Sequence, residues 1–416
     1  MTIWSPEWRI KIDGTNYTSI TLVGLTITSG RNNINSQAQA GYCQVELINR
    51  DNSNLPIDVA SDITIEVKKS NGSYLPIFGG TISDVSIGVR SSGSTTFTTS
   101  YNIIALGALF KLNKAVWTNS LAQDKDGTQI YTILTDLLLN NWSEVPAAQQ
   151  WSTYNATETW ANAQNIGLGE IDQPGQYTME QRSAGSIDFY SIITQIANSG
   201  LGYIYEDANG NIGYADSAHR TTHLAANGYR DLSANDALAL GIRATKRQGN
   251  IVNSYVLNYG NNFGSQVTSL NQSSIDSYGR YQITENSYVH SGTDAQAIAD
   301  RYIQLRAYPR AQFESITFAL QNPELDDSDR DALLAIFMGM PIRITDLPAL
   351  ISEGQFEGYI EGWTFTASIS GLSLRIVASP TEFSAVAQNW NQVNGSEAWN
   401  TLSPTLKWEN AIGVIS

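Results

Sequence analysis

Two histidines offer the first candidate for metal chemistry. His219 and His223 are four residues apart, the spacing that places two ligands on one face of a helix. The zinc-protease motif has a Glu directly after its first His, and here that position is Arg220. The third histidine, His290, is remote in the sequence. The pair therefore predicts no metal site, and we expect no cofactor.

Several carboxylates could serve a cell-wall hydrolase, and they fall in one polar, loop-rich stretch: Glu158, Glu170, Asp172 and Glu180. Such an enzyme needs two facing carboxylates or a metal-bound water. Carboxylates in polar loops are usually only solvated. The sequence also contains no Gly-x-Ser-x-Gly, phosphate-binding loop or dinucleotide fingerprint. We therefore expect a protein that is not an enzyme.

Two clusters of polar side chains could hold an ion but have simpler explanations. Asp207 begins a run with Asn209 and Asn211, but the calcium-loop pattern wants glycine where Ile212 stands, so the run predicts a hairpin turn. Asp326 opens a second cluster just before an apolar segment, which is typical of a helix cap. Whether an ion binds near Asp207 or Asp326 stays open.

Composition excludes several classes of protein. The chain has 416 residues, 42% of them hydrophobic, which is enough for two to four domain cores. The net charge is −15, so broad neutralisation of DNA phosphates is not expected. No apolar run is long enough to span a membrane, and we see no secretory signal. The only cysteine, Cys43, has apolar neighbours and is expected to be a core thiol.

The elements that would position these groups begin with a block of short strands. Alternating apolar residues bounded by turn signals predict strands at 9–12, 19–27, 43–48, 63–67, 77–87 and 97–105. This pattern is typical of an antiparallel barrel or sandwich. Residues 142–179 form a polar, aromatic insertion with Trp142, Trp151, Tyr154 and Trp160, a composition found on surfaces that bind sugars or proteins. Small local cores are the simpler explanation.

Helical periodicity appears between the strand-rich ends of the chain. Apolar residues recur at helical spacing over 128–141, 186–198 and 293–308, and Thr293 is the expected N-cap of the third helix. Further strands are expected at 201–205, 212–215, 251–259, 279–283 and 313–320, and a short helix at 332–337.

An internal repeat links the two ends. Phe78-Gly-Gly-Thr-Ile and Phe356-Glu-Gly-Tyr-Ile share a glycine two residues after Phe, at Gly80 and Gly358. The first motif lies between strands predicted at 63–67 and 97–105, and the second between strands predicted at 342–345 and 372–377. A glycine inside a strand marks a bulge or a close backbone approach. We interpret the pair as a duplicated barrel, and three such chains would make a ring of six similar barrels.

Tryptophan recurs every nine residues near the end, at Trp390, Trp399 and Trp408. Each is an aromatic anchor that packs either on its own second barrel or on a neighbouring chain. We expect four parts: a β-barrel at 1–115, a helix-containing insertion at 116–245, a second β-barrel with helices at 246–380 and the Trp tail at 381–416. We propose the three Trp residues, Phe78, Gly80, Phe356 and Gly358 as assembly contacts.

Several of these segments resemble minor tail proteins of long, flexible-tailed bacteriophages. The resemblance rests on Gly30-Arg31 with residues 39–49, on residues 78–84, on residues 299–309 and on residues 356–363, together with the Trp tail. None of these motifs is catalytic.

The resemblance implies a tail-tip or baseplate-hub protein of the virion, made in the host cytoplasm. Such hubs are commonly trimers of tube-like barrels that join the tail tube to tip proteins and surround the DNA exit channel. The expected partners are two further copies of this chain in a homotrimer and other tail proteins, namely distal tail or tube, tape-measure, and tip or fibre proteins. No sequence-specific binding of nucleic acid is expected. A receptor- or carbohydrate-binding tail protein and a tail-associated hydrolase remain alternatives. An acidic lumen would fit the net charge.

Overall fold

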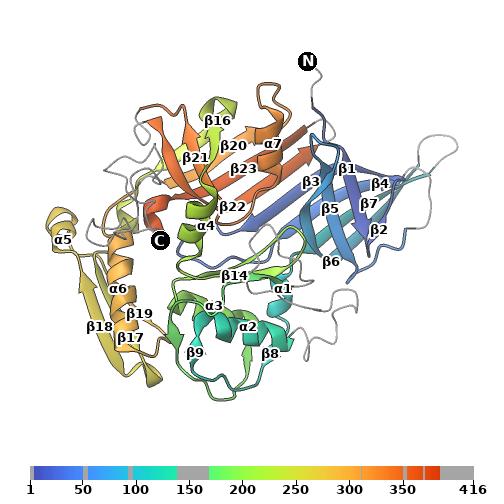
Figure 1. Cartoon of the computed structure of the whole chain (residues 1–416). Helices are drawn as coiled ribbons and strands as arrows, with labels where there is room; N and C mark the ends of the chain where they lie inside the picture. Colours follow the sequence, from blue (N-terminus) through green and yellow to red (C-terminus); the bar gives the residue numbers. More distant parts are fainter. Residues whose placement is uncertain are drawn as a thin grey trace.

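The computed structural model describes residues 4–49, 55–91, 97–137, 168–310, 312–349, 354–368 and 371–384. A mainly antiparallel sheet of 13 strands crosses the molecule (Figure 1). Its first half contains β1 (Trp8–Ile12), β2 (Thr15–Asn16), β3 (Ile20–Gly30), β4 (Tyr42–Asn49), β5 (Asp62–Lys68), β6 (Tyr74–Ser91) and β7 (Phe97–Leu106). These strands lie in the order β3-β4-β7-β6-β5-β1-β2.

The second half of the sheet comes mostly from the last third of the chain. It contains β15 (Arg230–Ser233), β16 (Ala237–Thr245), β20 (Gln312–Ala319), β21 (Pro341–Thr345), β22 (Phe356–Ser368) and β23 (Gly371–Pro380). The order is β16-β20-β23-β22, with β21 on β22 and β15 parallel to β21. Two strands within the predicted 116–245 insertion, β15 and β16, thus join the large sheet.

A compact middle unit lies mostly below the sheet in Figure 1, with its last helix, α4, drawn beside β22. It contains α1 (Leu109–Leu112), β8 (Val116–Trp117), β9 (Asp124–Lys125), α2 (Asp126–Asp136), β10 (Leu168–Ile171), β11 (Thr178–Met179), β12 (Ile187–Asp188), α3 (Phe189–Ser199), β13 (Tyr203–Glu206), β14 (Ile212–Ala215) and α4 (His219–Asn227). The helices α2 and α3 bury isoleucines at helical spacing, including Ile130, Ile133, Ile192 and Ile196.

A third unit stands at the left of Figure 1. It contains β17 (Ser254–Tyr259), β18 (Ser265–Leu270), α5 (Gln272–Tyr278), β19 (Gln282–Asn286) and α6 (Gly292–Arg306). Helix α6 packs on the three-stranded sheet formed by β17, β18 and β19. The ring of Tyr302 in α6 stacks on the ring of Tyr255 in β17, with 4.4 Å between the ring centroids. Helix α7 (Asp327–Leu334) follows β20, and 3-10 turns lie at Ala234–Asp236, Gln248–Asn250, Asn261–Phe263 and Thr381–Phe383.

The predicted elements of the first block are confirmed, although β6 is longer than expected. The prediction that Thr293 is the N-cap of α6 was wrong. The N-cap is Ser291, and its hydroxyl accepts a hydrogen bond from the backbone N–H of Asp294. Asp326 does cap α7, accepting from the N–H of Asp329 at 2.7 Å. Asp207 closes its hairpin by accepting the N–H groups of Asn209 and Asn211, as a plain turn does.

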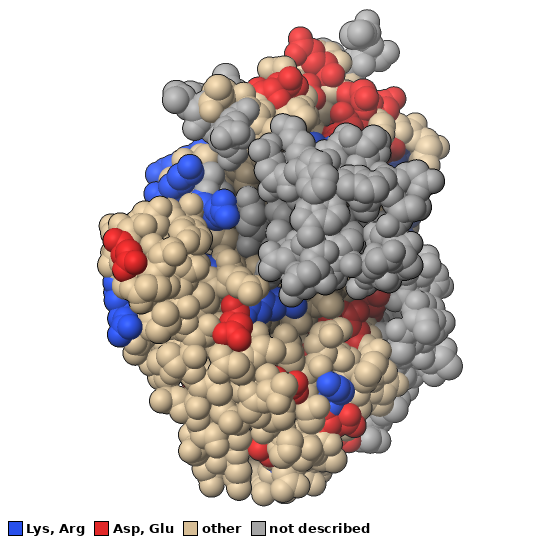
Figure 2. Space-filling view, turned by 60° about the vertical axis from the view of Figure 1, so that its left-hand side comes forward, with Lys and Arg blue, Asp and Glu red and all other residues tan. Residues whose placement is uncertain are grey.

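Charged side chains are sparse on the face seen in Figure 2, and acidic ones gather in its upper part. Most of the surface described there is neutral, in keeping with a chain in which only 15% of residues are charged. Within the described ranges, no helix combines the length and apolar character needed to cross a membrane. Cys43 is buried, as expected.

Candidate assembly interface

The repeated Phe-x-Gly motif forms the same local structure in both halves. A Cβ on Gly80 would lie 2.4 Å from the carbonyl oxygen of Leu106 and 2.8 Å from the Phe78 ring. A Cβ on Gly358 would lie 2.3 Å from the carbonyl oxygen of Ser379 and 2.6 Å from the Phe356 ring. Each Phe therefore covers the backbone of a glycine that has no room for a side chain.

The strand register around the motif is also repeated. In the first half Ile82 pairs with Ala105, and the register shifts before Asp84 pairs with Ile104. In the second half Ile360 pairs with Ala378, and the register shifts before Gly362 pairs with Val377. The same bulge thus occurs three residues after each of the glycines Gly80 and Gly358, at Ser83 and Glu361. The sequence repeat is a structural repeat, with β5-β6-β7 equivalent to β21-β22-β23.

The two halves meet where β22 pairs antiparallel with β3. The pairing runs from Gly362 opposite Gly30 to Ser368 opposite Gly24. Gly30 has a φ of +84°, and a Cβ there would lie 2.4 Å from the carbonyl oxygen of Glu361. Glycine at this position permits both the left-handed backbone and the close approach of the two strands.

A buried ion cluster lies at the end of this junction. Glu361, fully buried at the bulge of β22, accepts a hydrogen bond from Nε of Arg31 at 2.6 Å. It also accepts from both terminal nitrogens of Arg220 at 2.7 and 2.9 Å, and from the hydroxyl of Ser379. Burial alone would raise the pKa of Glu361, but the two guanidinium groups outweigh it and hold the pKa well below its usual range.

The same arginines join three parts of the chain. Arg31 follows β3, Arg220 belongs to α4 of the middle unit, and Glu361 belongs to β22. The guanidinium of Arg220 also lies 4.6 Å from the ring centroid of Tyr203 and 5.1 Å from that of Tyr359. Sequence reasoning missed this cluster. Its signal was a single acidic residue, Glu361, among the mostly apolar residues 359–365.

A second buried carboxylate fastens the middle unit to the first half of the sheet. Glu206, at the end of β13, accepts hydrogen bonds from the backbone N–H groups of Gly41 and of Leu109, the latter at 2.8 Å. A Cβ on Gly107 would lie 2.0 Å from its Oε1. Burial raises the pKa of Glu206 to about 7, although the two backbone hydrogen bonds act to lower it.

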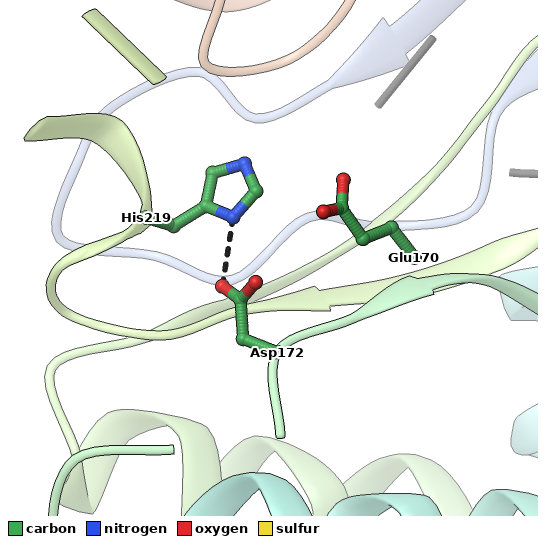
Figure 3. Close-up of side chains that lie close together, drawn as sticks. All are labelled: Glu170, Asp172 and His219. Carbon is green, nitrogen blue, oxygen red and sulfur yellow. Dashed lines mark hydrogen bonds and ion pairs between the residues drawn. The ribbon is translucent and has the colours of Figure 1, made fainter. Parts of the chain in front are cut away.

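The structure gathers three potential metal ligands that the sequence analysis considered separately. Glu170 and Asp172 at the end of β10 and His219 at the start of α4 place their ligand atoms within 4.8 Å of one another (Figure 3). His219 Nδ1 lies 2.7 Å from Asp172 Oδ2. Two carboxylates and an imidazole form a donor set suited to zinc or another first-row metal ion. Asp172 also accepts the backbone N–H of Asp216 at 2.9 Å, so the group fixes local structure as well.

The other candidates for chemistry do not join this group. The ring of His223 stacks on that of His219 and meets Phe337 edge-on. Burial, together with His219, lowers the pKa of His223 to about 4. Glu180 pairs with His290 at 3.0 Å instead. Glu158 lies outside the described residues.

The proposed assembly contacts have different positions. Phe78 and Phe356 are buried inside the chain, each over its own glycine. Their direct contact with a neighbouring chain stays a prediction. Trp390, Trp399 and Trp408 lie outside the described residues, as do the insertion aromatics Trp142, Trp151, Tyr154 and Trp160.

Comparison with known proteins gives a fold relationship. No protein-family model matches the sequence, and neither does any curated protein. The structure is similar to the 43 kDa tail protein of prophage MuSo2 from Shewanella oneidensis, with a TM-score of 0.53 and 11% identity over 91% of this chain and 98% of that one. It is also similar to a tail protein from Neisseria meningitidis MC58, with a TM-score of 0.56 and 9% identity over 92% of this chain and 98% of that one.

The chain has the fold of prophage tail proteins. Both of these tail proteins are matched over nearly their whole length, and the match covers more than nine tenths of this chain. The tail-protein fold expected from the sequence resemblance is therefore confirmed. At such low identity the likeness concerns the fold alone.

Proposed function

We propose that this chain is a structural protein of a phage tail tip, a baseplate-hub or minor tail protein that forms a ring of three copies. The observation that supports this most is the repeated strand unit in a fold shared with prophage tail proteins. Three copies of a two-unit chain present six similar units, which can dock on a sixfold tail tube. The ring joins the tube to distal tip proteins.

The work of such a ring is geometric and needs no catalysis. Its partners are other tail proteins, and it resides in the virion after synthesis in the host cytoplasm. The ring surrounds the channel through which DNA leaves. The net charge of −15 suits a lumen that does not retain passing DNA.

Native mass spectrometry and electron microscopy of the purified chain test this proposal. We expect a mass of three chains and a closed ring with a central hole. Immunogold labelling of phage particles that contain the chain should mark the tail tip. Labelling elsewhere on the particle, or a fixed stoichiometry other than three, would contradict the proposal.

The alternative functions are distinguished by direct assays. Release of muropeptides from purified cell walls would indicate a hydrolase, with Glu170, Asp172 and His219 as the first residues to replace. Binding on a glycan array that is lost when residues 142–167 are deleted would indicate a carbohydrate-binding role. We expect neither activity.

A further inference from the structure

The small parallel sheet of the middle unit brings two chain segments to one edge. β10 and β14 pair in parallel, with Ile171 opposite Tyr214, and the backbone N–H of Asp172 continues this pairing to the carbonyl oxygen of Tyr214 at 3.1 Å. Paired parallel strands run in one direction and end on the same side of their sheet. The residues that follow β10 and β14 therefore lie together, and those after β14 lead directly into helix α4.

The side-chain pattern of β10 places two carboxylates on one face. Glu170 and Asp172 are two residues apart, and side chains at that spacing project from the same side of an extended chain. Ile171 between them is fully buried, so it points into the core and the two carboxylates point away from it. His219, the first residue of α4, faces them, with Nδ1 2.7 Å from Oδ2 of Asp172 (Figure 3).

Hydrogen bonds outside the group hold all three positions in place. Oδ2 of Asp172 accepts the backbone N–H of Asp216 at 2.9 Å, and Oδ1 of Asp216 accepts the backbone N–H of His219 at 2.9 Å. The hydroxyl of Tyr205 donates to the carbonyl oxygen of Glu170 at 3.0 Å. Surrounding bonds of this kind orient the side chains that bind a metal ion. The fold thus fixes the three positions before any ion arrives.

Negative charge concentrates around this group. Burial raises the pKa of Asp216, and the neighbouring charge of Asp172 raises it further. Burial also raises the pKa of Tyr205, and the charges of Glu170 and Asp172 add to the effect. A bound cation is often the largest local charge in a site, and here it would relieve the repulsion between these carboxylates.

The separations suit a single ion. Bonds from zinc to nitrogen and oxygen ligands are about 2.0–2.2 Å long, so two ligands of one ion lie roughly 3 to 4.4 Å apart. The potential ligand atoms of Glu170, Asp172 and His219 lie within 4.8 Å of one another. Figure 3 shows the carboxylate of Glu170 turned toward the other two side chains. Rotation about the side-chain bonds of Glu170 brings its carboxylate into the range that one ion requires.

We propose that Glu170, Asp172 and His219 bind one divalent transition-metal ion of the zinc type. The ion takes the place of the proton in the hydrogen bond between His219 and Asp172, so neither side chain has to be free of other contacts. An imidazole beside carboxylates suits zinc and its first-row neighbours, whereas calcium and magnesium take oxygen ligands. With three protein ligands, a fourth position is left to water.

The role of the ion is to fasten α4 to β10. His219 directly precedes Arg220, which donates to Glu361 at the junction between the two halves of the large sheet. An ion bound by His219 therefore anchors the end of the helix that brings Arg220 to the junction. This role does not depend on the formation of a ring.

Zinc titration of the full chain tests the site. Chain treated with EDTA and then dialysed into metal-free buffer should bind one zinc ion per chain in isothermal titration calorimetry. Glu170→Gln and His219→Ala should each weaken zinc binding by at least about tenfold, since each removes one of three ligands. Calcium should not compete with zinc, because an imidazole does not suit calcium.

Glu180 and His290 provide the matched control. They are also a carboxylate and an imidazole in contact, at 3.0 Å. Among the described residues, no third ligand of the same kind gathers with them. Glu180→Gln and His290→Ala should therefore leave zinc binding unchanged.

Two further measurements keep the test valid if His219→Ala does not fold. Glu170 is partly exposed and glutamine has its shape, so Glu170→Gln should fold. Zinc at about 100 times its dissociation constant should raise the thermal unfolding midpoint of the unmodified chain by roughly 3 °C and leave that of Glu170→Gln unchanged. X-ray absorption of the zinc-loaded chain should show nitrogen and oxygen ligands at about 2.0–2.1 Å, with one imidazole and no sulfur.

The contrary outcomes are equally definite. Zinc binding that Glu170→Gln leaves intact, or that His290→Ala abolishes, would overturn the proposed site. The same holds if the unmodified chain does not bind zinc, or if calcium displaces zinc. None of these results bears on the ring of three, which native mass spectrometry tests separately.

Discussion

Phe365 of β22 lies directly opposite Ile27 of β3, and both side chains are buried in the core. These residues belong to the two halves of the large sheet and are far apart in the sequence. Their contact continues one apolar layer from the first half of the sheet into the second, so the two halves share a core.

Replacing Phe365 with Ala should remove the central contact of this junction. Loss of a buried Phe costs about 3–5 kcal/mol of unfolding free energy, because transferred apolar area is lost and a cavity remains. Thr366→Ala, at the exposed neighbour on the same strand, should change stability by less than about 0.5 kcal/mol. Urea unfolding measures both, and equal losses would contradict a shared core.

Replacing Glu361 with Gln should be similarly costly. Arg31 and Arg220 would remain buried without their carboxylate, and breaking a buried ion pair from one side costs about 3–5 kcal/mol. The control is Glu357→Gln, on the same strand as Glu361. It removes the partly exposed ion pair of Glu357 with Arg343 and should cost about 0–1 kcal/mol of unfolding free energy. Thermal unfolding of the two variants side by side measures the difference. A tolerant Glu361→Gln variant would show that the cluster does not stabilise the junction.

The two motif glycines should respond alike to alanine. Gly80→Ala and Gly358→Ala each force a Cβ against a carbonyl oxygen and a Phe ring, and such overpacking costs about 1–3 kcal/mol. Gly24→Ala, in β3, is the control, because a Cβ there would have no neighbour within 4 Å. Denaturant unfolding should show loss at 80 and 358 and none at 24. Unequal losses at the two motif positions would weaken the structural equivalence.

Glu206 should make stability fall as pH rises. Its pKa is about 7 in the folded chain against 4.5 for the free side chain, so the folded state binds more protons between these values. Stability from this group is full below about pH 4.5 and is lost by about pH 7, with a total on the order of 3 kcal/mol. Unfolding measured from pH 4.5 to 8 reports the slope.

Glu206→Gln should reduce this slope without abolishing it. Burial also raises the pKa of Asp126, to about 6, so that residue keeps a dependence of the same sign. An unchanged slope in the variant would show that Glu206 titrates near its ordinary pKa.

Local pattern alone determined much of the fold. Alternating apolar residues predicted the strands of the first block because one face of each strand packs on the core. The repeat was visible because Phe78 and Phe356 each precede, by two residues, a glycine that has no room for a side chain. The spacing of apolar residues predicted the helices. The N-cap of α6 was predicted at Thr293 and lies at Ser291, because serine and threonine both favour the N-cap position and the local sequence does not distinguish them.

Only the tertiary structure decided which distant segments meet. No local pattern states that β22 pairs with β3, because a strand edge accepts any backbone of matching direction and register. The pairing of Arg31 and Arg220 with Glu361, and the gathering of Glu170, Asp172 and His219, depend on that long-range arrangement. The sequence determined the repeated units, and the packing of those units determined where buried charges come together.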